Sequence, residues 1–293
     1  MKGIILAGGS GSRLLPLTSI ISKQLLPVYD KPMIYYPLCT LLLADIKDIL
    51  IISTPNDLPN IEKAIGDGSR FGISISYLIQ PQPEGIAQAF LLAEEFISNQ
   101  PCVLILGDNI FYGNGLSTIL KNAVIRAKEG ISTLFSYYVA QSQFFGVLEL
   151  HDEKPLRIEE KPAVPKSNYI ITGLYFYNKN VIRYAKELIP SKRNELEITD
   201  LNNIYLQQEE LYLQILGKGY VWMDLGTPES LFEASQFIYS IESRNGIITY
   251  SPEEISFRKG WINRSTLLKY ADLYGNTKYG VYLKCLADGK ILK

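Results

Sequence analysis

The sequence contains 293 residues, of which 47% are hydrophobic and 20% are charged, and its formal net charge is −1. This composition is typical of a globular protein, and without a basic excess it argues against a nucleic-acid-binding function. The three cysteines are far apart, which fits neither a disulfide framework nor a zinc ribbon and indicates a reduced, cytoplasmic protein. No membrane-spanning segment is predicted, because charged residues interrupt the most apolar stretch, residues 41–52.

Apolar runs alternate with helix-like stretches through the first half of the sequence. The pattern predicts strands over residues 3–7, 48–53, 74–80, 103–106 and 132–139, with helices between them over 33–44, 60–65, 86–97 and 116–128. Near-continuous apolar strands that alternate with helices indicate an α/β fold, a mostly parallel sheet with helices on both faces. Such a sheet binds its ligands outside the carboxyl ends of the strands.

The second half begins with alternating apolar and polar residues. The pattern predicts antiparallel strands added to the sheet over 146–150, 157–160 and 169–177. Helices are predicted over 181–188 and 198–208, followed by strands over 211–216 and 220–224. A helix over 228–242 is predicted to begin after Thr227, and short helices follow near 253–258, 266–270 and 279–286. We therefore expect one domain spanning residues 1–293, with a catalytic core at 1–240 and a helical C-terminal extension at 241–293.

The sequence contains one histidine, His151, in the polar turn 151–155, where a solvated side chain is expected. A mechanism that needs a histidine base, a histidine nucleophile or several histidine ligands is therefore not predicted. The chemistry must depend on carboxylates, cations and backbone groups.

The first predicted strand runs into the sequence GGSGSR, which begins at Gly8. Gly8, Gly9 and Gly11 would let the backbone approach a triphosphate and direct N–H groups at its oxygens, and Arg13 would add a charged, planar donor. The run is neither a Walker A loop nor a complete G-x-G-x-x-G, because the last position of the latter is Leu14. Taken alone, it is typical of both a structural turn and a phosphate loop.

Two later clusters would complete a nucleotide site. Lys23 follows the glycine run closely and would add a cation for a triphosphate, although a single lysine is usually a solvated surface charge. Gln80 ends a predicted strand, and its amide offers the donor and the acceptor that suit the edge of a pyrimidine ring. Gly85 would let the backbone approach the base, and an ordinary turn between strand and helix is the alternative.

Two aspartates follow apolar strands. Asp108 comes after the strand at 103–106, and Asp224 ends the strand at 220–224. Mg²⁺ usually takes one or two protein carboxylates together with phosphate and water oxygens. The pair therefore predicts a magnesium site, although an aspartate in such a position also serves as a helix cap.

Glu160 and Lys161 form a candidate site for a sugar phosphate. The carboxylate of Glu160 would accept hydrogen bonds from sugar hydroxyls, and Lys161 would bind the phosphate. Adjacent strand residues point to opposite faces, so both can serve one ligand only if the chain twists at Pro162, which cannot continue a strand ladder.

Eight segments, in this order along the chain, carry a resemblance to a known family: GGSGSR, SKQLLPVYDKPMIYYPL, QPQPEGIAQAF, LGDNIFYG, EEKP, ITGLYFY, ELEITD and SPEEISFRKGWI. Over essentially its whole length the chain resembles the bacterial glucose-1-phosphate thymidylyltransferases of the short sugar nucleotidyltransferase family. The resemblance implies a Rossmann-like fold, a homotetramer and Mg²⁺. It also implies that dTTP and α-D-glucose 1-phosphate give dTDP-glucose and pyrophosphate, the entry to dTDP-rhamnose synthesis.

The resemblance also implies roles for single residues. Those implied to bind substrates and metal are Gly8, Gln80 and Gly85 on the thymine, Arg13 and Lys23 on the triphosphate, Asp108 and Asp224 on Mg²⁺, Gly146, Glu160 and the backbone of Ile171 on the glucose, and Lys161 on its phosphate. Those implied to form a second, regulatory nucleotide site near a subunit interface are Lys218, Ser251, Glu253, Glu254, Ile255 and Arg258. The sequence departs from the family pattern at Phe145, Lys218 and Leu225, where tyrosine, arginine and threonine are common.

The reaction that we expect is a direct displacement. A phosphate oxygen of the sugar phosphate attacks the α-phosphorus of the nucleotide. No general base is needed, because the second pKa of the sugar phosphate is about 6 and the group is mostly ionised at pH 7. A preference for UTP and a catalytically silent nucleotide-sugar sensor are the alternatives. A nicotinamide-dependent dehydrogenase is disfavoured by the missing third glycine of its fingerprint.

Overall fold

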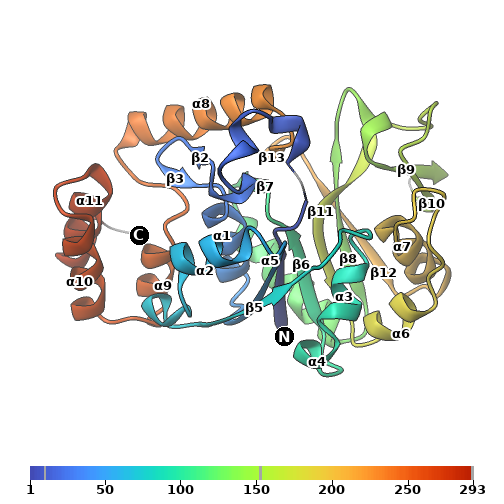
Figure 1. The fold of residues 1–293 in the computed structure, drawn as a ribbon, viewed down its shortest axis with the longest axis horizontal. Coiled ribbons are helices and arrows are strands. Elements are labelled where there is room, and N and C mark those ends of the chain that lie inside the picture. The colour runs from blue at the N-terminus through green and yellow to red at the C-terminus, as the bar shows by residue number, and fades with distance from the viewer. Residues whose placement is uncertain (10, 152–153, 292–293) are drawn as a thin grey trace.

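A central sheet with helices on both faces forms most of the molecule (Figure 1), and the computed structural model describes residues 1–9, 11–151 and 154–291. The strands of this sheet are β1 (Lys2–Leu6), β4 (Asp48–Ser53), β5 (Ser74–Ile79), β6 (Cys102–Leu106), β8 (Ser132–Tyr138), β9 (Gly146–His151), β10 (Lys154–Glu160), β11 (Tyr169–Tyr177) and β12 (Leu211–Leu216). Within the described chain they pair in the order β10-β9-β11-β6-β1-β4-β5, with β8 on β11 and β12 on β8. The predicted α/β fold is confirmed.

Parallel and antiparallel pairs divide this sheet into two parts. β1 is parallel to β4 and β6, β4 is parallel to β5, and β12 is parallel to β8. β11 is antiparallel to β6, β8 and β9, and β10 is antiparallel to β9. The strand predicted over 132–139 thus joins the antiparallel part through β11. The strand direction changes between β6 and β11, and residues from both sides of this change form the candidate site.

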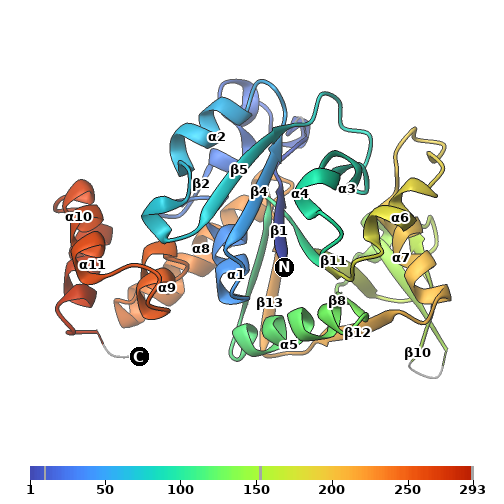
Figure 2. The ribbon, with the colours of Figure 1, turned by 90° about the horizontal axis from the view of Figure 1, so that it is seen from below.

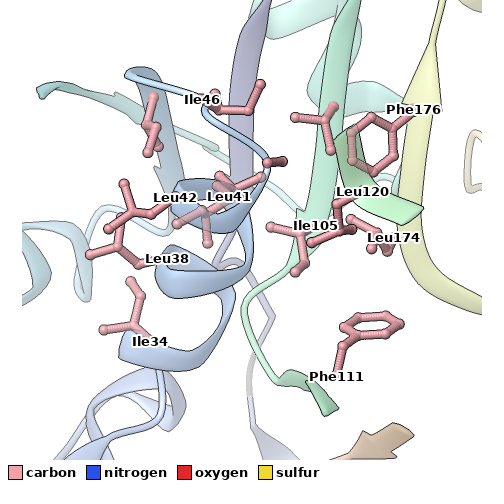
Figure 3. Packing of buried hydrophobic residues seen from close by; sticks show 14 of the residues in the cluster. Ile34, Leu38, Leu41, Leu42, Ile46, Ile105, Phe111, Leu120, Leu174 and Phe176 are labelled. Carbon is pink, nitrogen blue, oxygen red and sulfur yellow. The ribbon is translucent and has the colours of Figure 1, made fainter. Parts of the chain in front are cut away.

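Helices on the two faces bury alternate residues of each strand. The helices are α1 (Tyr35–Leu43), α2 (Leu58–Ile65) and α5 (Leu116–Lys128) on one face, and α3 (Gln88–Leu92), α4 (Glu94–Ile97), α6 (Val181–Lys186) and α7 (Ile198–Gln207) on the other (Figure 2). On β1, Ile5 belongs to the first apolar layer, whereas Ile4 and Leu6 belong to the second, as the two-residue period of a strand requires. Figure 3 shows Leu41 of α1 and Ile105 of β6 within the first layer.

The helix predicted over 86–97 is wrong in one respect, because the structure divides it into α3 and α4. The break is at Ala93, whose ψ of 12° lies outside the helical range. Phe90 before the break and Ile97 after it are both buried. The bend therefore keeps both short helices packed on the sheet.

A two-stranded ribbon lies outside the main sheet. It consists of β7 (Asn109–Gly113) and β13 (Tyr220–Asp224), which are antiparallel. The sequence predicts β13, but we did not expect a strand at β7. Because β7 follows β6 after two residues, the ribbon brings a late part of the chain back to the end of β6.

The C-terminal part of the chain is helical, with α8 (Pro228–Asn245), α9 (Pro252–Arg258), α10 (Arg264–Tyr274) and α11 (Lys278–Ala287). Thr227 caps α8 as predicted, since its hydroxyl accepts from the N–H of Ser230. Helices α10 and α11 lie at the end of the molecule opposite β9 and β10 (Figures 1 and 2). Of the helices in the described chain, none combines the length and apolar character that crossing a bilayer requires. The division at residues 240 and 241 stays a prediction.

A buried ion pair ties α8 to the hairpin of β2 (Pro27–Val28) and β3 (Lys31–Pro32). Nζ of Lys31 lies 2.9 Å from Oε1 of Glu242, and both side chains are at most 1% exposed. The same oxygen accepts from the backbone N–H and the hydroxyl of Thr249, at 2.8 and 2.9 Å. Glu242 thus joins the hairpin that follows Lys23 to the segment that leads into α9.

We expect Lys31→Met to lower the free energy of unfolding by about 3–5 kcal/mol, because it leaves the Glu242 carboxylate buried without a cation. Urea denaturation measures this change. Lys186→Met is the control, because the side chain of Lys186 is 54% exposed and its pair with Glu94 is a surface pair, worth about 1 kcal/mol or less. Equal losses in the two variants would contradict the prediction.

Candidate active site

A cavity of about 530 Å³ opens beside the end of β6. Its walls come from both halves of the chain and from both parts of the sheet. The predicted site residues that line it are Arg13, Asp108, Gly146, Glu160, Lys161, Ile171 and Asp224. The structure therefore brings the predicted metal, sugar and sugar-phosphate residues, and one predicted triphosphate residue, to one place.

The ribbon of β7 and β13 sets the position of the two aspartates. In its register Asp224 lies opposite Asn109, the residue that follows Asp108. The N–H of Leu225 then donates to the carbonyl oxygen of Asp108 at 3.0 Å. Asp224 thus reaches the cavity from the ribbon and not from the main sheet.

Both carboxylate oxygens of Asp108 have a protein partner. Nζ of Lys23 contacts Oδ2, and Nδ2 of Asn109 donates to Oδ1 at 3.0 Å. Oδ1 of Asn109 accepts from Nε1 of Trp222 at 2.7 Å and from the N–H of Gly173 at 3.1 Å. Because these two groups only donate, the amide of Asn109 must present its nitrogen to Asp108.

The electrostatics of Asp224 follow from its surroundings. Burial and then the negative charge of Asp108 raise the pKa of Asp224 to about 6, against the opposing charges of Lys23, Arg13 and Lys161. Two neighbouring carboxylates that destabilise each other's charge fit a divalent cation, which prefers oxygen ligands. In the described part of the chain, no group of three or more His, Cys, Asp or Glu side chains is arranged to hold a metal ion. Substrate and water oxygens would supply the remaining ligands.

Arg13 lies directly against the segment that follows Asp224. It belongs to the short 3-10 helix Ser12–Leu14, and a Cβ on Gly226 would lie 2.7 Å from its Nη2. A side chain at position 226 would therefore displace the guanidinium. Ser10, inside the predicted glycine loop, lies outside the described residues.

Glu160 and Lys161 line the same cavity because the backbone reverses at Lys161, one residue earlier than expected. Lys161 has a φ of 43°, in the left-handed region. Its N–H donates to the carbonyl oxygen of Phe145 at 3.0 Å. Oε2 of Glu160 accepts from the hydroxyl of Thr199 at 2.5 Å, and its Oε1 lies 3.3 Å from Nη2 of Arg193.

Cavity residues that were not among the predicted ones include the polar Asn109 and Thr199 and the aromatic Trp222. Asn109 and Thr199 lie inside the segments LGDNIFYG and ELEITD quoted above. Each is an uncharged polar residue close to a charged one, and this pattern could have identified them from the sequence. Trp222 precedes Asp224 by two residues on β13, and the period of a strand predicts that both share a face.

The predicted base-binding residues lie outside this cavity. Gln80 packs over Gly8 so closely that a Cβ on Gly8 would collide with its Oε1. Gly85 has a φ of 100° and abuts the backbone of Leu196. The N–H of Leu196 donates to the carbonyl oxygen of Glu84 at 2.7 Å, and the segment 84–87 is thereby fastened to the start of α7.

Gly9 and Lys23 line a second hollow of about 510 Å³, together with residues 18–22 and parts of 54–60. Gly11 is held nearby, since its carbonyl oxygen accepts from the hydroxyl of Thr18 at 2.8 Å. Lys23 contacts Asp108 and also reaches this hollow, so it lies between the glycine run and the metal candidates.

Five of the predicted regulatory residues cap or belong to α9, and Lys218 follows β12. Ile255 lines a cavity of about 350 Å³ with Tyr112 and Tyr250, among others. The others do not line this cavity. Ser251 and Glu253 are buried, and Glu254 and Arg258 form an ion pair at 2.7 Å. Lys218 lies in the exposed turn between β12 and β13. His151 ends β9 and is exposed, as predicted, whereas Asp152 and Glu153 of its turn lie outside the described residues.

A model of the nucleotidyl transferase family matches residues 2–241, and the chain belongs to this family. Its relatives include proteins named glucose-1-phosphate thymidylyltransferase. The one from Neisseria meningitidis is 51% identical over 97% of this chain and 98% of its own length. The one from Mycolicibacterium smegmatis is 50% identical over 98% of this chain and 99% of its own length.

Solved structures show the same fold. A Bacillus anthracis protein described as a candidate glucose-1-phosphate thymidylyltransferase, in complex with sucrose, has a TM-score of 0.74 and 42% identity over 81% of this chain and 94% of its own. A UDP-glucose pyrophosphorylase complexed with UDP-glucose has a TM-score of 0.72 and 25% identity over 82% of this chain and 98% of its own.

We expect Asp224→Asn to stabilise the protein in metal-free buffer at pH 7.5. The pKa of Asp224 in the folded chain, about 6, lies above the value of about 3.9 for an unfolded aspartate. The neutral form therefore stabilises the fold below about pH 4, and this contribution is lost as the pH rises through about 6. Removing the charge should raise Tm at pH 7.5 by about 6 °C, which corresponds to roughly 3 kcal/mol.

The difference in Tm between Asp224→Asn and the unmodified protein should disappear near pH 4. Asp272→Asn is the control, because the side chain of Asp272 is 70% exposed, and we expect no stabilisation from it. A lower Tm for Asp224→Asn at pH 7.5 would show that the carboxylate is not under electrostatic strain.

Proposed function

We propose that this chain transfers a thymidylyl group from dTTP to α-D-glucose 1-phosphate and releases pyrophosphate. The observation that carries the proposal is the single cavity in which two carboxylates, two cations and Glu160 meet. The relatives that match nearly the whole chain are named for this activity. The route to dTDP-rhamnose is the context that the resemblance implies.

Asp108 and Asp224 would hold a divalent cation, for which Mg²⁺ is the expected ion. When bound, it would neutralise charge on the phosphates at which the displacement takes place. Lys23 contacts Asp108 without the metal, and on binding of nucleotide it would turn toward the triphosphate. Relief of the repulsion between Asp108 and Asp224 would favour binding of the ion.

The remaining catalytic task is to hold two anions in line. Arg13 beside Gly226 would bind the nucleotide phosphates, and Lys161 would bind the phosphate of the sugar. Cations held in position lower the barrier because they offset the electrostatic repulsion between the two negatively charged substrates. The sugar phosphate is its own nucleophile, so no side chain has to accept a proton.

The hydroxyls of the glucose would contact Glu160, whose orientation Thr199 and Arg193 hold. Gly146 leaves room for the sugar, because a Cβ there would lie 3.0 Å from the hydroxyl of Thr199. The backbone of Ile171 would complete this subsite. Gly8, Gln80 and Gly85 would receive the base, beside the triphosphate residues Gly9, Gly11 and Lys23.

Three further statements stay predictions. The homotetramer and the regulatory nucleotide site on Lys218, Ser251, Glu253, Glu254, Ile255 and Arg258 come from the resemblance, and the cytoplasmic location comes from the widely spaced cysteines. Within one chain Ser251 caps α9 and Glu253 accepts from Tyr274 and Tyr279, so both would serve such a site by holding α9 in place.

Lys161→Met should reduce turnover by about 10²–10³, because it removes the cation for the sugar phosphate. Pyrophosphate release at saturating dTTP and glucose 1-phosphate measures the loss. Lys166→Met is a matched control, since the two lysine side chains are 49% and 52% exposed and each has a glutamate partner. Similar turnover in the two variants would remove Lys161 from the mechanism.

We expect a grid of four nucleotides and several sugar phosphates to give the highest kcat/KM for dTTP with glucose 1-phosphate. A pyrophosphate-release assay of dTTP and UTP in competition decides between the proposal and a uridylyltransferase. Absence of pyrophosphate with every pair, from a chain that binds nucleotide sugar, would indicate the catalytically silent sensor.

A further inference from the structure

The side-chain amide of Gln80 has one occupied end and one free end. Gln80 is 3% exposed, and its Nε2 donates to Oε1 of Gln88 at 2.7 Å. Its Oε1 faces the backbone of Gly8, and no donor in the described chain forms a hydrogen bond with it. The free end of the amide is thus a hydrogen-bond acceptor, provided that the amide cannot turn over.

The orientation of Gln88 is fixed by two groups whose polarity cannot change. A carboxylate oxygen of Glu84 accepts from Nε2 of Gln88 at 2.7 Å. The backbone N–H of Glu84, which only donates, reaches Oε1 of Gln88 at 3.2 Å. The carboxylate and the N–H therefore both hold the Gln88 amide in the same orientation. In this orientation Oε1 of Gln88 faces Gln80, so Gln80 must turn its donor, Nε2, toward it.

We propose that Gln88 is a positioning residue for base recognition: it forces Gln80 to present an acceptor to the nucleobase. This inference rests on the proposed function, in which Gln80 receives the base. A base whose ring nitrogen carries a hydrogen, as thymine and uracil do at N3, donates to this acceptor. Cytosine has a lone pair at the same position, and it would oppose the lone pairs of Gln80.

The selectivity depends on the fixed orientation and not on the glutamine alone. A glutamine free to rotate about its last bond exposes either its oxygen or its nitrogen, and so pairs with thymine and cytosine alike. Gln88 removes that freedom. Its own position is rigid, because it is the first residue of α3 and is 8% exposed.

Three substitutions of Gln88 separate polarity from packing. Gln88→Met keeps the length of the side chain but removes the acceptor, and we expect the preference for dTTP over dCTP to fall about 10- to 100-fold. Gln88→Glu combined with Glu84→Gln keeps an acceptor for Gln80 and for the N–H of residue 84 and restores a donor between the two side chains, so most of the preference should remain. Gln88→Lys puts a donor there, turns Gln80 over and should shift the preference toward dCTP.

The measurement is the ratio of kcat/KM for dTTP and dCTP in pyrophosphate release at a fixed concentration of glucose 1-phosphate. Dissociation constants of the two nucleotides from calorimetry give the same ratio without turnover. Gln82→Met is the control, because Gln82 is an exposed glutamine of the same loop, and its ratio should equal that of the unmodified protein. The KM for glucose 1-phosphate should stay constant throughout.

An unchanged ratio in Gln88→Met would overturn the proposal, and so would equal losses in Gln88→Met and in the double variant Gln88→Glu with Glu84→Gln. These outcomes differ from failure of the proposed function. If the unmodified chain bound dTTP more tightly than dCTP but released no pyrophosphate, the transferase assignment would fail, and the calorimetric ratios would still test the role of Gln88.

Discussion

The antiparallel pairing of β7 with β13 is the constraint on which the site depends. It brings Asp224 to the residue next to Asp108, although 116 positions separate them in the sequence. The fold buries Asp224 beside the like charge of Asp108 at a cost in free energy, because burial and then that charge raise the pKa of Asp224. Arg13 and Lys23 offset part of that cost, and a bound cation would offset more. Functional sites commonly retain such local instability.

Two side-chain amides in this structure are oriented by the same principle. Asn109 receives only donors at its oxygen, from Trp222 and Gly173, and therefore turns its nitrogen to Asp108. Gln88 is likewise set by groups that cannot exchange roles. In both, a buried amide passes a fixed hydrogen-bond orientation from the scaffold to a residue that we propose to face substrate. On that proposal both amides would contribute to recognition through the residue that they orient.

The sequence predicted the sheet and its helices, because apolar periodicity and turn residues act locally, and its motifs predicted seven of the residues that line the cavity. Three features could not be obtained in this way. Strand β7 is short and pairs only with a segment far along the chain. The reversal at Lys161 depends on a left-handed backbone that no glycine marks. The contact of Lys23 with Asp108 exists only once β6 has been placed beside the glycine run.

Leu196 is held to residues 84 and 87 through main-chain atoms alone, by bonds of 2.7 and 3.2 Å. Any amino acid other than proline can provide these atoms, so the junction leaves position 196 open to other apolar side chains that pack, as Leu196 does, against the second apolar layer. The spacing of the chain is not free in the same way. Insertions or deletions between α6 and α7 would shift the register of the junction and separate residues 84–87, beside the proposed base site, from the proposed sugar subsite. Among descendants of this gene, length should therefore vary less than composition in that connection.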